Sequence, residues 1–191
     1  MKLEFTEIQE IDHLMWPENY QEISRDSPAL SVFTDFKVRR PLILEPDTAA
    51  HEAEDFMLSA HVKLKLVVDD DSHFLGVVAM EDLRHPDFLA RVAAVYTRDS
   101  LKVIDIMRPR DSLTALAYAD LEKATVGDII NSLQHYVHQH CLVVDKASHR
   151  LRGIISVSDI ARKLKIKIEL QHTPSFAELH LAAQAQIPVG L

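Results

Sequence analysis

Apolar residues recur along the chain at two spacings, which predict alternating helices and strands. Within residues 49–58 the apolar positions 49, 50, 53, 56 and 57 follow the 3.6-residue period of one helix face. Residues 126–137 repeat this period at 126, 129, 130, 133 and 137. Short β-branched runs predict strands, each followed by a second strand across a polar turn. These predicted strands span residues 64–68 and 75–79, and residues 141–144 and 153–157.

The same order of elements occurs twice. Residues 41–44 and 113–118 predict a leading strand, so each unit has the order β-α-β-β-α. Three pairs of identical residues stand 77 positions apart: Thr48 and Thr125, Gly76 and Gly153, and Asp82 and Asp159. Units of this size bury too little apolar surface to be stable alone. The sequence therefore predicts an α/β (α+β) fold in which two tandem repeats pack about a pseudo-twofold axis.

The repeats divide the chain into four parts. We expect an N-terminal arm, two repeats and a tail, at residues 1–34, 35–90, 101–166 and 167–191. The tail predicts a short helix over residues 175–186, with Ser175 as its N-cap and an apolar stripe on one face.

The composition of the chain limits the kinds of binding partner and cellular compartment that we expect. The formal charge of −8 comes without a long basic stripe, which argues against nucleic acid. The single cysteine, Cys141, permits no intrachain disulfide and fits a reducing compartment. The start of the chain lacks a secretory signal, and no apolar run reaches the ~18 residues of a membrane span. We expect a cytoplasmic protein without a membrane partner.

The repeated pattern resembles a known family. The segments PDT (46–48), LVVDDDSHFLGVVAMEDL (66–83), DIM (105–107) and LVVDKASHRLRGIISVSDI (142–160) are similar to the CBS domain, named after cystathionine β-synthase. The similarity covers about residues 35–90 and 101–166. It implies a Bateman module, a pair of CBS domains that often forms a disc-shaped homodimer. Such a pair binds AMP, ADP, ATP or S-adenosylmethionine between its repeats and regulates an as yet unidentified partner protein.

The second repeat carries the stronger candidate site. Ser156 ends a strand and Asp159 begins the next helix. A carboxylate can accept hydrogen bonds from both ribose hydroxyls, and a hydroxyl at a helix start suits a phosphate. The residues alone favour a simpler role, in which Asp159 or Ser158 caps the helix. The resemblance implies the ligand role, with Asp159 on the ribose and Ser156 on the phosphate.

The first repeat departs from the family pattern. Asp82 keeps the ribose position, but Ala79 stands where the family often has Ser or Thr and offers no donor to a phosphate. Thr48 and Thr125 match the family's threonine near the cleft, and both also fit helix N-caps. From Asp105 to Thr125 the chain is longer than from Asp35 to Thr48. This difference predicts an insert at residues 110–123 beside the cleft of the second repeat.

Other chemistry finds little support. His135 and His138 are three apart on a predicted helix, near His140 and Cys141. A position on the solvent-exposed side of this helix explains the two histidines better than a metal site does. No Gly-rich phosphate loop and no nucleophile or zinc-protease motif occurs, so we expect neither an enzyme nor a required cofactor.

Two alternatives to the ligand sensor stay open. One is a structural dimerisation or scaffold module without ligand. The other is a protein that docks on a partner enzyme or transporter through its arm or tail.

Overall fold

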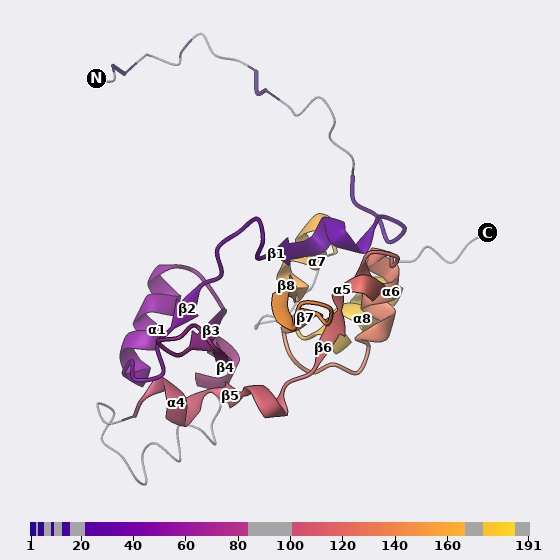
Figure 1. The fold of residues 1–191 in the computed structure, drawn as a ribbon. Helices are drawn as coiled ribbons and strands as arrows, with labels where there is room; N and C mark the ends of the chain where they lie inside the picture. The colour runs from indigo at the N-terminus through magenta and orange to yellow at the C-terminus, as the bar shows by residue number, and fades with distance from the viewer. Residues whose placement is uncertain are drawn as a thin grey trace, which may run out of the picture.

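The computed structural model describes residues 22–83, 101–166 and 174–185, with positions 1–2, 4–5, 9 and 13–15 near the N-terminus. Within these residues the chain forms two four-stranded sheets flanked by short helices (Figure 1). One sheet has the order β2-β3-β4-β5 and belongs mainly to the first repeat. The other has the order β1-β8-β7-β6 and belongs mainly to the second. The predicted fold of two tandem repeats related by a pseudo-twofold axis is confirmed.

Both sheets combine one parallel and two antiparallel pairings. The first sheet consists of β2 (Ile43–Leu44), β3 (Leu64–Val68), β4 (Phe74–Ala79) and β5 (Arg108–Pro109). The second consists of β1 (Phe33–Asp35), β8 (Arg150–Ser156), β7 (His140–Asp145) and β6 (Ala115–Ala117). The first repeat carries helices α1 (Ala50–Ser59) and α2 (Met80–Leu83), and α4 (Val103–Ile106) packs against α1. The second repeat carries α5 (Tyr118–Leu121), α6 (Val126–Ser132), α7 (Val157–Lys163) and α8 (Phe176–Ala185), and the 3-10 turns are η1 (Ala29–Val32) and η2 (Arg110–Ser112).

Each sheet is completed by a strand from the segment that precedes the other repeat. Strand β1 pairs with β8, and β5 pairs with β4, both antiparallel. Figure 1 shows the indigo β1 beside the orange β8, and β5 beside the strands of the first repeat. The predicted arm extends to residue 34, but β1 is part of the second sheet. Strands of two or three residues carry no readable alternation, which is why the exchange was missed.

The exchange explains two of the four glycines. A Cβ atom at Gly153 would lie 2.1 Å from the carbonyl oxygen of Thr34 on β1. A Cβ atom at Gly76 would lie 2.3 Å from the carbonyl oxygen of Arg108 on β5. Any larger residue would collide with the backbone of the neighbouring strand. The matched glycines of the two repeats therefore allow the exchanged strands to lie close to their sheets.

The tail helix belongs to the core of the second repeat. Phe176 and Leu179 of α8 are fully buried, and α8 packs against α6 and α7. The Oγ of Ser175 accepts a hydrogen bond from the Glu178 N–H at 3.3 Å, and the Glu178 carboxylate accepts one from the Ser175 N–H at 2.7 Å. This reciprocal pair is a capping box, and it begins the helix where the sequence predicts it.

Two helix predictions need correction. The predicted helix over residues 126–137 ends as α6 at Ser132, and Val137 is 72% exposed rather than part of an apolar face. Tyr136 packs against the core in its place. Helix α1 begins at Ala50 with Ala49 as its N-cap, so Thr48 does not cap it.

The insert predicted at residues 110–123 is much smaller than expected. The strand pairing makes Pro109 the counterpart of Asp35, because Asp35 lies opposite Gly153 and Pro109 lies opposite Gly76. The first repeat has 14 residues from Asp35 to the helix N-cap Ala49, and the second has 16 residues from Pro109 to the helix N-cap Thr125. The alignment of Asp105 with Asp35 was therefore wrong, and the second repeat is longer by only two residues.

The other domain limits stay predictions. Parts of the arm, the end of the first repeat after residue 83, and the tail at 167–173 and 186–191 lie outside the described residues.

Candidate functional site

The two sheets face each other across an apolar layer that joins the repeats. Successive side chains of a strand point to opposite faces, so alternate residues of β3, β4, β7 and β8 point toward the other repeat. The buried residues of this layer are Leu64, Leu66, Val77, Ala79 and Leu142. Four of the five belong to the first repeat, and the second repeat adds partly buried apolar residues, among them Leu151 and Ile154.

The two repeats differ where the paired strands meet the helices. In the first repeat Leu64 lies opposite Ala79, and both are buried, at 9% and 1% exposure. In the second repeat the same place holds His140 opposite Ser156. Ser156 is also the N-cap residue of α7, yet its side chain makes no capping hydrogen bond. The second repeat thus presents an imidazole and a hydroxyl where the first is apolar.

Asp159 lies in the first turn of α7, close to Ser156 in the chain. Its Oδ1 accepts a hydrogen bond from Nη2 of Arg162 at 2.5 Å, and its side chain is 34% exposed. The N-cap position belongs to Ser156, so the alternative in which Asp159 or Ser158 caps the helix is wrong. A hydroxyl and a partly exposed carboxylate therefore both lie at the start of α7.

Asp82, the counterpart of Asp159, is already paired within the chain. Its Oδ2 lies 2.9 Å from Nε of Arg108 on the exchanged strand β5. The backbone N–H of Ala79 donates to the same oxygen at 3.4 Å. Burial raises the pKa of Asp82, although the charge of Arg108 opposes this shift. The first-repeat position thus holds an internal guanidinium where a ligand would have to bind.

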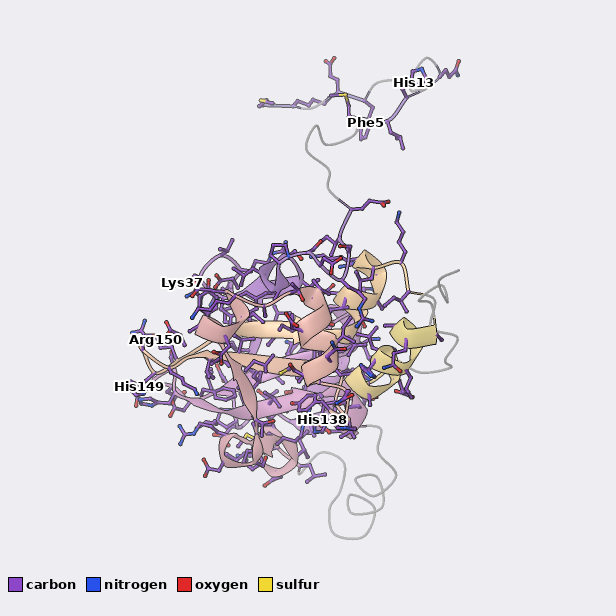
Figure 2. The ribbon with its side chains drawn as sticks, turned by 90° about the vertical axis from the view of Figure 1, so that its right-hand side faces the viewer. Phe5, His13, Lys37, His138, His149 and Arg150 are labelled. Carbon is purple, nitrogen blue, oxygen red and sulfur yellow. The ribbon has the colours of Figure 1, made fainter. Side chains whose placement is uncertain are left out.

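Glu81 links the repeats beside this pair. Its Oε1 lies 3.4 Å from Nη2 of Arg108 and 3.2 Å from Nδ1 of His138 in the second repeat. Burial acts to raise the pKa of Glu81, but the hydrogen bond with His138 and the charge of Arg108 outweigh it and lower the pKa. In Figure 2 His138 lies well away from the turn that carries His149 and Arg150. The polar cluster therefore occupies one end of the strands.

His140 brings to the cluster a buried nitrogen, Nδ1, without a hydrogen-bond partner among the described residues. Burial lowers the pKa of His140 to about 4, with Glu81, Arg108, Lys63 and Asp159 acting in smaller, opposing ways. The imidazole is therefore neutral at physiological pH.

Sequence reasoning missed Glu81, Arg108 and His140 as members of the site. Only His140 could have been found from the sequence. When the strands of the two repeats are aligned, His140 takes the position that Leu64 has in the first repeat.

The two threonines lie apart from this cluster. Thr125 is the N-cap of α6, where its Oγ1 accepts a hydrogen bond from the Asp128 N–H at 3.1 Å. Thr48 contributes its backbone, since its carbonyl accepts from the Val103 N–H at 2.8 Å. Neither is hydrogen-bonded to Ser156, Asp159 or Asp82 in the described part of the chain.

Metal ligation finds no support in the geometry. His135 and His138 follow the end of α6 and do not share a helix face. Among the described residues no three His, Cys, Asp or Glu side chains converge on a point that suits a metal ion. Burial raises the pKa of Cys141 to about 12, so its thiol stays protonated. None of the helices described here has the length and apolarity to cross a bilayer.

The family model of the CBS domain matches residues 33–86 and 103–166, which is more than half of the chain. The chain therefore belongs to the CBS-domain family, whose paired domains are generally regulatory modules. No curated protein matches it.

Several solved structures share the fold. An uncharacterized conserved protein from Pyrococcus horikoshii is 19% identical with a TM-score of 0.56, over 78% of this chain and 99% of its own. The CBS-domain protein ATU1752 from Agrobacterium tumefaciens is 21% identical with a TM-score of 0.51, over 65% and 84%. CBSX2, a CBS-pair protein from Arabidopsis thaliana, is 23% identical in its complex with AMP, with a TM-score of 0.51 over 71% and 94%. At these identities the similarity concerns the fold alone.

Proposed function

We propose that this chain is a regulatory module that binds an adenosine-containing ligand between its repeats. The observation that carries the proposal is the polar set His140, Ser156 and Asp159 at an interface that is apolar in the first repeat. Asp159 would accept the ribose hydroxyls, and Ser156 with the start of α7 would hold a phosphate. The AMP complex of CBSX2 supports this class of ligand.

The first-repeat position supports a single site per chain. Arg108 neutralises Asp82 and occupies the space beside it, and Ala79 offers no hydroxyl. A ligand there would have to displace a half-buried ion pair, which is costly once both partners lose water. We expect AMP, ADP, ATP or S-adenosylmethionine to bind at the second repeat.

The signal would be a shift between arrangements of the two repeats. A ligand between them favours the arrangement to which it binds more tightly, and the shift cannot exceed that difference in affinity. Glu81 and His138 cross the same interface, so a change in spacing alters their 3.2 Å contact. The module would act as a homodimer, and a partner protein would read the change.

The second candidate is a structural dimerisation module without ligand. The ion pairs of Arg108 with Asp82 and of Asp35 with Arg152 tie the exchanged strands to their sheets without any bound molecule. Docking of a partner on the apolar face of the tail helix is less well supported, because that face is buried in the chain's own core.

The test is thermal unfolding in the presence of AMP, ADP, ATP, S-adenosylmethionine and NAD, with GTP as the control. A ligand that binds only the folded state adds about 2.7 kcal/mol at 100 times its Kd. We expect a saturable stabilisation by one adenine compound, which Asp159→Asn abolishes and the matched change Asp82→Asn preserves. No stabilisation by any of them at millimolar concentration would refute the nucleotide sensor and favour the structural module.

A further inference from the structure

Two exposed segments bring five basic side chains together at one end of the second sheet. These side chains, which we call the basic patch, are Lys37, Arg39 and Arg40 after β1, Lys146 in the turn between β7 and β8, and Arg150 at the start of β8. Strand β1 is antiparallel to β8, and the Phe36 N–H donates to the carbonyl of Arg152 at 2.9 Å, so the two segments are neighbours. In Figure 2 Lys37, His149 and Arg150 lie on the same side of the molecule, and His138 lies apart from them.

The carboxylates beside the basic patch are engaged by the chain itself. Asp35 binds Arg152 and accepts a hydrogen bond from the Lys37 N–H at 2.8 Å. Asp145 accepts hydrogen bonds from the N–H groups of Ala147 and Ser148 at 3.0 and 3.4 Å. Hydrogen bonding lowers the pKa of both carboxyl groups, and it also fixes the backbone of both segments. In the described part of the chain, none of the five basic side chains forms an ion pair.

An apolar side chain stands within the basic patch. Val38 lies between Lys37 and Arg39 in the chain and is 82% exposed. A single exposed apolar residue is ordinary on a protein surface. Here it is surrounded by exposed cations on a backbone that hydrogen bonds hold in place. The surface therefore matches a partner segment that combines carboxylates with an apolar side chain.

The fold does not require basic residues at this turn. The corresponding turn of the first repeat, between β3 and β4, carries Asp69, Asp70 and Asp71 and joins the same pair of strands. The whole chain has a formal charge of −8, which opposes the approach of a long polyanion such as nucleic acid. Charges are screened beyond about 8 Å at physiological ionic strength, so a short acidic segment responds mainly to the local cations.

We propose that the basic patch is the surface on which the module docks an acidic segment of its partner protein, with Val38 contacting an apolar side chain of that segment. This inference rests on the proposed function, because it names the surface through which the regulatory module contacts its partner. Opposite charges speed the encounter and select the partner. Arg150 begins β8 and Ser156 ends it, so the docked segment and the nucleotide occupy opposite ends of the strand.

The experiment is a fluorescence anisotropy titration of the full-length protein with a labelled peptide in which glutamate alternates with leucine. We expect saturable binding that weakens as sodium chloride is added. Lys146→Glu combined with Arg150→Glu should weaken binding by about tenfold. The matched control combines Lys102→Glu with Arg110→Glu, which changes the net charge equally at two exposed cations outside the patch and should leave the affinity nearly unchanged.

A second variant tests the apolar contact separately from charge. Val38→Ala should weaken binding of the glutamate–leucine peptide by about threefold or more, because less apolar surface is buried. It should leave binding of polyglutamate unchanged. Equal losses for the two peptides would overturn the role of Val38.

Thermal unfolding of the same variants shows that each is folded and measures nucleotide binding independently. The absence of saturable peptide binding would overturn the docking surface, while stabilisation by an adenine compound would still support the proposed function. If peptide binds and no nucleotide stabilises the protein, the docking surface stands and the nucleotide sensor is refuted. Equal effects of the two double variants would overturn the inference, because net charge alone would then explain binding. Tighter binding of oligothymidylate than of peptide, lost in Lys146→Glu with Arg150→Glu, would overturn it in favour of a nucleic-acid surface.

Discussion

Asp35 and Arg152 form the best-defined ion pair between strand β1 and the second repeat. Nε and Nη2 of Arg152 lie 2.7 and 2.8 Å from the two carboxylate oxygens of Asp35. The guanidinium also stacks over the ring of Tyr118, 4.1 Å from its centre. Both charged side chains are largely shielded from water, and the hydrogen bonds from Arg152 lower the pKa of Asp35 to about 2. Such a two-pronged pair is stronger than an ordinary surface salt bridge.

Asp35→Asn should therefore destabilise the protein by about 2 kcal/mol at pH 7, the range for hydrogen bonds to charged groups. A pKa that is lower in the folded state adds stability above the unfolded value, near 3.9 for Asp. This contribution is lost as the pH falls from about 4 to about 2. Chemical denaturation across this range should show a larger loss of stability in the unaltered protein than in Asp35→Asn, because other carboxylates such as Glu81 contribute equally to both. The exposed Asp70→Asn is the control, and equal pH profiles for Asp35→Asn and the unaltered protein would contradict the argument.

At the scale of single residues, the sequence predicts what lies within one motif. Ser156 and Asp159 are three positions apart, so their shared helix start follows from the local pattern. Arg108 and Glu81 are 27 positions apart and meet only because β5 crosses to the first sheet. Their pairing depends on a strand of two residues, which leaves no periodic signal.

Helix α8 shows how an element outside the repeats becomes part of one. Phe176 is fully buried, and its ring meets that of Tyr136 edge to face, with centres 6.0 Å apart. The Phe176 N–H also donates to the carbonyl of His138 at 3.2 Å. The helix therefore supports the loop that carries His138 toward Glu81, although the family model ends before it.

Removing the Phe176 ring should destabilise the second repeat strongly. Phe176→Ala deletes a fully buried ring, which costs about 3–5 kcal/mol when the neighbours cannot close the cavity. Leu181→Ala on the same helix is the matched control, because Leu181 is 65% exposed and its loss should stay within about 0.5 kcal/mol. Urea denaturation measures both. A loss for Phe176→Ala no larger than that of the control would show that α8 is not docked in solution.

Element predictions succeed where the period is long enough to read. The helix at the start of the first repeat and the tail helix match α1 and α8 within one residue at each end. The prediction that the helix from residue 126 extends to residue 137 was wrong. Val137 continues the apolar helical period by chance, although α6 ends at Ser132. The strands β1 and β5 are set by pairing with the other repeat, which a local pattern does not reveal.

The whole molecule is held together by mutual exchange of segments. Strand β5 is an edge strand of the first sheet, and β1 is an edge strand of the second, so each sheet depends on a segment from outside its own repeat. Helix α1 is also tied to the segment before the second repeat, since the Ala50 N–H donates to the carbonyl of Leu101 at 2.8 Å. On the other side the Val126 N–H donates to the carbonyl of Ser27 at 2.9 Å. Neither repeat is complete on its own.

We therefore expect one cooperative unfolding transition rather than one for each repeat. Calorimetry should give equal calorimetric and van't Hoff enthalpies, the mark of two-state unfolding. Gly153→Ala would push β1 off its sheet and Gly76→Ala would push β5 off the other, each at a cost of about 3 kcal/mol from overpacking. Because the repeats share their edges, each substitution should lower the same single transition. Two separate transitions, with only one of them lowered by each glycine change, would show that the repeats fold independently despite the exchange.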